Sequence, residues 1–190
     1  AIGHALAAGD VDHAAGLIEG EALALLRYRQ EGTLRRWLDA LPDHVFDVRP
    51  VLADAHAGCL LVTGRTQAVD RRLTQAERWI ASIGDPEALE AAVRSGMQAT
   101  DPEALRRLPA GVSLHRAGLA WMQGDMAGAT RHARTALELA RDEPMEAGGA
   151  AAILGLAHWT TGELIAAHGA WSEAIAALGT AGHHADAEPL

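Results

Sequence analysis

The fold of this chain is decided by two stretches that align residue for residue at a spacing of 38: AWMQGDMAGATRHARTALELA, residues 120–140, and HWTTGELIAAHGAWSEAIAAL, residues 158–178. The alignment places Trp121 on Trp159, and each stretch carries a glycine followed twelve residues later by an alanine. A period of this size with small residues at fixed offsets is typical of arrays of paired helices, in which each pair buries its apolar face against the next. The two stretches therefore predict an all-α fold.

Helical signals extend over the rest of the chain, and strand signals are nearly absent. The pairs Asp85-Pro86 and Asp101-Pro102 each predict the start of a helix, because an aspartate N-cap precedes a proline in the first turn. Pro50 predicts another start, because a proline in the first turn lacks only an N–H group that the helix does not use.

A separate helix is expected from about Val112 to Gln123, whereas the segment from Asp43 to Arg49 is expected to be a loop. We count about ten helices and no linker long enough to divide domains. The expected architecture is a right-handed superhelix of antiparallel helix hairpins, a solenoid that forms a single helical-repeat domain over residues 1–190.

Composition limits the kinds of partner. Hydrophobic residues make up 49% of the 190 residues but aromatic residues only 4%, so the helices are expected to pack closely through alanine. The formal charge of −9 repels phosphate backbones, which argues against direct contact with nucleic acid. Arginine pairs such as Arg71-Arg72 alternate with acidic stretches and are expected on solvated helix faces.

The compartment is predicted to be the cytoplasm. Cys59 is the sole cysteine, so no internal disulfide can form, and no signal peptide opens the chain. The longest apolar run, residues 147–157, is too short to span a bilayer. The chain starts at Ala1 inside a helical pattern, which suggests a piece of a longer protein; exposed apolar end faces are then expected to cause weak self-association.

The interval from Gly64 to Ala76 repeats the glycine-to-alanine spacing, which is also that of the tetratricopeptide motif. The chain departs from this motif, because its step exceeds the usual length of about 34 residues and the closing proline is missing at the expected offset. Over nearly its whole length the chain resembles the MalT-like helical-repeat region of large ATP-binding LuxR-family transcription regulators. The strings that carry the resemblance include AIGHALAAGDVDHAAGLIE, TLRRWLDALP, RPVLADAHAGCLLVTGR and LPAGVSLHRAGLAWMQGDMAGATRHARTALEL.

The resemblance implies that the repeats receive a signal, a small-molecule effector or a protein partner, in a concave groove. In that family a nucleotide-binding module precedes the repeats and a DNA-binding helix-turn-helix follows them. No G-x-x-x-x-G-K-[ST] motif occurs here, so this fragment is expected to hold no cofactor, with ATP and DNA bound by other parts of the parent protein. The alternative is a generic tetratricopeptide adaptor with no transcriptional role.

Five residues are candidates for ligand binding: Trp121, Trp159, Arg65, Asp125 and Glu163. In tetratricopeptide folds the position that both tryptophans occupy lines the concave surface, but the longer repeat could instead turn them into the core between repeats. The two acids each follow a glycine, so capping of the next helix explains them more simply than ligand contact. The arginine also follows a glycine, and capping does not explain it.

Neither catalysis nor metal binding is predicted. The ten histidines show no helical metal-binding pair, and the one cluster, His183-His184 with Asp186, lies near the chain end. They are expected to be surface residues without a metal role. No serine stands in a recognisable nucleophile motif, and Cys59 has no positive partner nearby in sequence. The chain is therefore not expected to be an enzyme.

Overall fold

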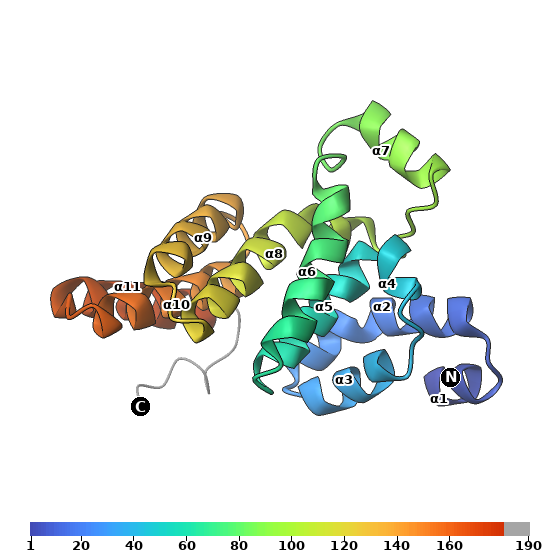
Figure 1. Cartoon of the computed structure of the whole chain (residues 1–190), viewed down its shortest axis with the longest axis horizontal. Helices are drawn as coiled ribbons and strands as arrows, with labels where there is room; N and C mark the ends of the chain where they lie inside the picture. The colour runs from blue at the N-terminus through green and yellow to red at the C-terminus, as the bar shows by residue number, and fades with distance from the viewer. Residues whose placement is uncertain (181–190) are drawn as a thin grey trace. The chain divides into compact units, whose positions relative to one another are not determined.

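A computed structural model describes residues 1–180, apart from the side chain of Arg27. All regular structure in these residues is helical, which confirms the predicted all-α class (Figure 1). The helices are α1 (Ile2–Ala7), α2 (Val11–Arg27), α3 (Glu31–Asp39), α4 (Val45–Val48), α5 (Pro50–Leu61), α6 (Thr66–Ile80), α7 (Pro86–Arg94), α8 (Pro102–Met122), α9 (Met126–Leu139), α10 (Pro144–Thr160) and α11 (Leu164–Thr180).

Contacts between residues group the chain into two compact units, Ala1–Leu108 and the residues from Pro109 onward. Each unit buries apolar side chains of its own. The right-handed superhelix and the single domain over 1–190 stay predictions.

Two predicted boundaries were wrong. The expected helix from Val112 is the second half of α8, which runs without a break through Pro109. Proline removes one backbone hydrogen bond inside a helix, but it does not end this one. The expected loop from Asp43 to Arg49 contains the short helix α4, whose Val45 and Phe46 are buried.

The predicted capping residues are confirmed. Asp85 accepts a hydrogen bond from the Glu87 amide at 3.0 Å, and Asp101 accepts one from the Glu103 amide at 2.9 Å. Pro50 occupies the first turn of α5. These helices therefore begin where aspartate and proline satisfy or remove the free amide groups of a first turn.

The first unit has a core of large side chains from five helices. Helix α5 is mostly apolar, with Asp54 and His56 as its polar side chains, as expected for a helix covered by neighbours, and it packs against α3, α4 and α6. The largest fully buried side chains of this unit are Phe46, Ile18, Leu34, Leu38, Leu52, Leu73 and Val69.

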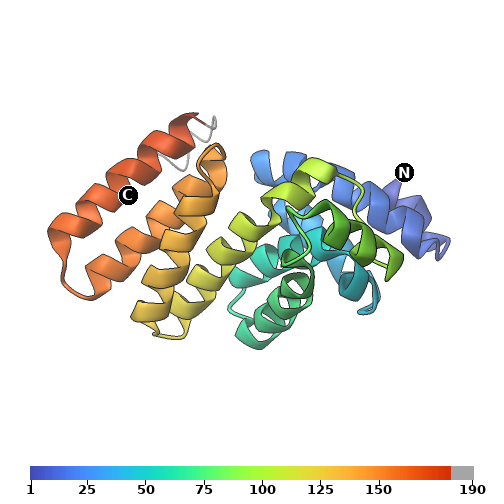
Figure 2. The same ribbon diagram turned by 90° about the horizontal axis from the view of Figure 1, so that it is seen from above.

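The second unit is built from alanine and glycine instead. Helix α10 packs between α9 and α11, and α10 and α11 form an antiparallel hairpin (Figure 2). A Cβ on Gly148 would lie 2.6 Å from Cγ of Leu178, so only glycine permits this approach of the two helices. This close packing confirms what the alanine-rich composition predicts.

The turns of this unit repeat the same geometry. Gly124 follows α8 with a φ of 80°, and Gly162 follows α10 with a φ of 83°, in the left-handed region that favours glycine. In each turn the acidic residue after the glycine directly precedes the next helix. The repeat seen in the sequence is therefore a repeat of backbone conformation.

Candidate functional site

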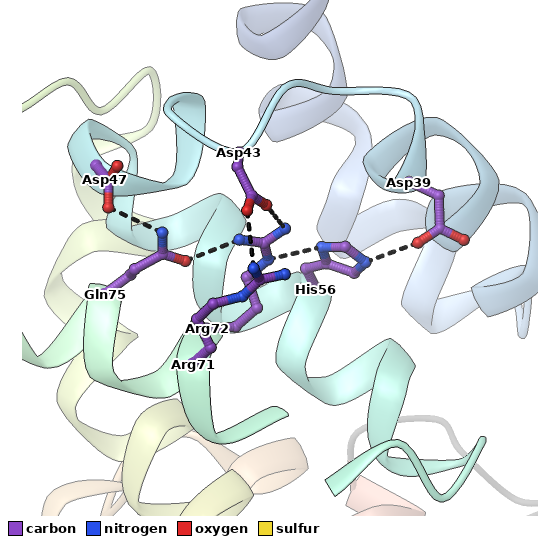
Figure 3. A network of polar contacts seen from close by, with 7 residues as sticks. All are labelled: Asp39, Asp43, Asp47, His56, Arg71, Arg72 and Gln75. Carbon is purple, nitrogen blue, oxygen red and sulfur yellow. Dashed lines mark hydrogen bonds and ion pairs between the residues drawn. The ribbon is translucent and has the colours of Figure 1, made fainter. Parts of the chain in front are cut away.

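A group of polar side chains in the first unit joins four of its helices (Figure 3). Arg71, Arg72 and Gln75 come from α6, His56 from α5, Asp47 from α4 and Asp39 from α3. Asp43 lies in the segment between α3 and α4. We call these seven residues the polar network.

Arg72 is the centre of the polar network. The residue is only 4% exposed. Its guanidinium donates hydrogen bonds to Nδ1 of His56 at 3.1 Å, Oε1 of Gln75 at 2.9 Å and Oδ1 of Asp43 at 2.6 Å. The guanidinium carbon also lies 3.7 Å from the centre of the Phe46 ring, a cation–π arrangement. A buried arginine is tolerated here because its charge is paired and its donors are used.

His56 is held in one tautomer by two partners. Because Nδ1 accepts from Arg72, the ring proton belongs on Nε2, which lies 3.0 Å from Oδ1 of Asp39. Burial lowers the pKa of His56 below its ordinary value, and the hydrogen bond to Asp39 opposes this only in part. The hydrogen bond from Arg72 likewise lowers the pKa of the Asp43 carboxyl.

The polar network has the geometry of a structural clamp. Both ring nitrogens of His56 are engaged and the residue is 4% exposed, so it presents no free nitrogen to a substrate. Gln75 extends the polar network to α4 by donating a hydrogen bond to Asp47 at 2.8 Å. Two expectations are corrected here: Arg72 does not lie on a solvated helix face, although its neighbour Arg71 does, and His56 is not a surface histidine.

A buried ion pair also ties the first unit together. Glu19 of α2 is 3% exposed and accepts from Arg49 at 3.1 Å and from the backbone amide of Thr100 at 2.7 Å. The pair joins segments that are 30 and 81 residues apart in the sequence. Neither Glu19 nor Arg49 stands out in the sequence, because nothing local marks them as partners.

The two candidate tryptophans differ in their surroundings. Trp121 is half-buried and packs on a cluster formed by Ala120, Ala129 and Ala157. Trp159, its equivalent one repeat later, is 58% exposed. The difference arises because Ala157 comes from α10, which follows the first hairpin, and no described helix follows the second.

The two candidate acids also differ. Asp125 is the N-cap of α9 and accepts from the Gly128 amide at 2.8 Å, as the capping interpretation predicts. Glu163 instead bonds the ring of His158 across the turn between α10 and α11. Arg65 is exposed at the N-cap position of α6, where its side chain makes no capping hydrogen bond.

Glu163 lines a surface hollow of about 680 Å³ beside α9 in the second unit. Its wall combines cationic, hydroxyl and acidic groups, including Thr130, Arg131, Arg134, His158, Thr161 and Glu163. Guanidinium groups bind carboxylates and phosphates, and threonine hydroxyls can both donate and accept. The hollow thus has groups suited to a small polar ligand, and of the five candidates only Glu163 lines it.

Within residues 1–180, no group of three or more histidine, cysteine, aspartate or glutamate side chains could hold a metal ion. The predicted cluster of His183, His184 and Asp186 lies outside the described residues. Cys59 is buried in α5, and burial raises the pKa of its thiol to about 12.

None of the helices in the described part of the chain is long and apolar enough to cross a membrane. Comparisons of the chain with protein-family models, with curated proteins and with solved structures find no match.

Proposed function

We propose that this chain is the sensor and protein-interaction region of a MalT-like, LuxR-family transcription regulator. In this proposal it works in the cytoplasm and catalyses no reaction itself. The observation that carries the proposal is the repeated hairpin: α10 and α11 copy the turn of α8 and α9, and the copy leaves an aromatic side chain, Trp159, exposed. Repeated helix pairs of this kind offer extended surfaces for binding.

The hollow beside α9 is the proposed effector site. A small ligand with anionic or hydroxyl groups would contact Arg131, Arg134 and the neighbouring threonines, with Glu163 and His158 at the adjoining turn. Such a ligand transmits a signal only if it binds one arrangement of the helices better than another. ATP and DNA would be bound by other parts of the parent protein.

The gene surrounding this chain tests the proposal directly. We expect its reading frame to encode a phosphate-binding G-x-x-x-x-G-K-[ST] motif before these residues and a helix-turn-helix after them. A reading frame with neither would favour the generic tetratricopeptide adaptor.

A binding measurement tests whether DNA is bound only by other parts of the parent protein. Because the chain carries a net charge of −9, it should show no salt-dependent binding to duplex DNA on its own. Fluorescence anisotropy with labelled DNA checks this, and micromolar affinity that falls with added salt would contradict it.

A further inference from the structure

A surface hollow of about 660 Å³ in the first unit is lined by three arginines. Arg29 comes from the turn between α2 and α3, and Arg35 and Arg36 come from α3. Thr33 and Asp39 of the same helix also line the space, which we call the arginine hollow. Its volume lies within the range of roughly 300–1,000 Å³ that is typical of small-molecule sites.

Positive charge prevails among the residues that line the arginine hollow. Asp39 is the one acidic residue among the described residues of its wall, and Oδ1 of this carboxylate already accepts a hydrogen bond from Nε2 of His56 at 3.0 Å. Three guanidinium groups and one carboxylate leave an excess of two positive charges. Since the whole chain carries a net charge of −9, the hollow runs against the overall charge balance.

The two arginines of α3 have no carboxylate partner. Among the described residues, neither Arg35 nor Arg36 forms an ion pair or a side-chain hydrogen bond. Arg36 is exposed and Arg35 is half-buried. Most other arginines of the first unit are paired with carboxylates, namely Arg49, Arg71, Arg72, Arg78, Arg94, Arg106 and Arg107. Two guanidinium groups of the hollow thus keep their donors for a ligand.

The backbone of Arg29 has an unfavourable conformation. Its φ of 56° lies in the left-handed region, and Arg29 is the one described residue other than glycine with a positive φ. Turns after other helices of this unit place glycine there, as at Gly9 and Gly64. Arg29 pairs with Glu31 at 3.7 Å, but its side chain is 62% exposed, so this pair adds little stability. An arginine where glycine is favoured indicates that its side chain serves something other than folding.

The start of α3 adds hydrogen-bond donors to the arginine hollow. No side chain caps this helix, and Gly32 in its first turn lines the hollow. Backbone amides of a first turn lack partners within the helix and attract anions. The hydroxyl of Thr33 can donate as well. Amide and hydroxyl donors therefore lie beside the guanidinium groups.

We propose that the arginine hollow binds the phosphate group of a small phosphate monoester. Such a phosphate carries a charge of about −1.5 to −2 at pH 7, which matches the excess of two positive charges, whereas a carboxylate carries a single negative charge. Guanidinium groups bind phosphate oxygens through paired hydrogen bonds. The hollow shares no residue with the effector site proposed beside α9, so this inference does not rest on the proposed function.

The test is isothermal titration calorimetry of the 190-residue chain with phenyl phosphate. We expect a dissociation constant below about 1 mM, which is reasonable for a ligand of this size. Benzoate has the same ring and a single charge, so it should bind at least about tenfold more weakly. A peptide of about ten residues with one phosphoserine should not bind more tightly than phenyl phosphate, because the hollow has the size of a small-molecule site.

Variants of the chain locate the bound phosphate. Arg29→Gly and Arg36→Gln should each raise the dissociation constant for phenyl phosphate about tenfold or more, because each removes charge-assisted hydrogen bonds. Arg94→Gln is the matched control: its side chain is 69% exposed, it belongs to the same unit and it does not line the hollow. This equal loss of charge should leave binding unchanged within about twofold. Circular dichroism verifies that the variants retain the helical content of the parent chain.

Arg29→Gly has a second readout that separates binding from stability. Glycine adopts the left-handed conformation without strain, so this variant should melt about 2–4 °C higher than the parent chain while it binds phenyl phosphate less well. An arginine kept for the stability of the turn would give a lower melting temperature instead. Opposite changes in affinity and melting temperature therefore support a ligand-binding role for Arg29.

Four outcomes would overturn the inference: no binding of phenyl phosphate up to about 10 mM, equal affinity for benzoate, an equal loss of binding in Arg94→Gln, or a lower melting temperature of Arg29→Gly. Tighter binding of the phosphoserine peptide would also overturn it, since the ligand would then be a protein. Loss of binding in Arg131→Gln but not in Arg36→Gln would place the phosphate beside α9 instead. That result would favour the proposed effector site, so failure here is distinguishable from failure of the proposed function.

Discussion

Arg72 donates its Nε hydrogen to Nδ1 of His56, at 3.1 Å, inside the first unit. This bond requires an unprotonated Nδ1, and the other ring nitrogen is already directed to Asp39. The polar network is therefore complete only while His56 is neutral. It couples the packing of α3, α5 and α6 to the charge of one imidazole.

The stability of the first unit should consequently depend on pH. His56 has a lower pKa in the folded chain than the value of about 6.5 expected after unfolding, so the unfolded chain binds more protons in the interval between the two. The contribution of His56 to the free energy of unfolding should be complete above pH 6.5 and should decrease as the pH falls below this value. Urea unfolding from pH 8 to pH 5 measures this, with His56→Gln as the comparison: an equal decrease in both proteins would contradict the assignment to His56.

Removal of the Arg72 side chain should destabilise the first unit strongly. Arg72→Met leaves His56 and Gln75 without a buried donor, and we expect a loss of about 2–4 kcal/mol. Arg71→Met is the adjacent control: Arg71 and its partner Asp43 are both exposed, so the loss should stay within about 1 kcal/mol. Denaturant unfolding of both variants measures these changes. Similar losses of unfolding free energy in the two variants would show that Arg72 is not the centre of the network.

The two repeat-related tryptophans should respond differently to truncation. Trp121→Ala removes a side chain packed on Ala120, Ala129 and Ala157, so it should cost about 2–4 kcal/mol, less than a fully buried aromatic. Trp159→Ala should cost less than about 1 kcal/mol, because the side chain is 58% exposed. Thermal and urea unfolding of both variants test this, and equal losses would mean that Trp159 is covered in solution.

Two glycines of the second unit form a matched pair. A Cβ on Gly155 would collide with the indole of Trp171, so Gly155→Ala should destabilise by about 1–3 kcal/mol. Nothing lies within 4 Å of a Cβ on Gly169 in α11, so Gly169→Ala should stabilise by about 0.5–1 kcal/mol through the better helix propensity of alanine. Calorimetric melting temperatures should therefore shift in opposite directions, and a shared direction would contradict this packing.

The fold class could be predicted from the sequence because helix signals are local. Aspartate followed by proline, and glycine followed by an acidic residue, act within one turn, and the structure places helix starts at these pairs. The run through Pro109 was not predicted, since a proline inside a helix is an exception to the local rule.

The polar network was not predicted because its partners on different elements lie between 16 and 29 residues apart in the sequence and meet only after the helices pack. One local signal did exist. Arg72 and Gln75 fall between Val69, Leu73 and Ala76 on the buried side of α6, and a polar pair within an apolar stripe requires internal partners. The exposure of Trp159 could not be predicted either. Trp121 and Trp159 occupy equivalent positions in the repeat, and they differ only in whether a further helix packs on them.

The burial of Cys59 has a practical consequence for experiments on this chain. Burial raises the pKa of the Cys59 thiol to about 12, so very little thiolate is present at neutral pH, and the thiolate is the form that reacts with maleimides. Since Cys59 is the sole cysteine, a second cysteine introduced at an exposed position such as Ile165 would take up a fluorophore or spin label almost alone. The chain can therefore be labelled at an introduced cysteine without first replacing Cys59.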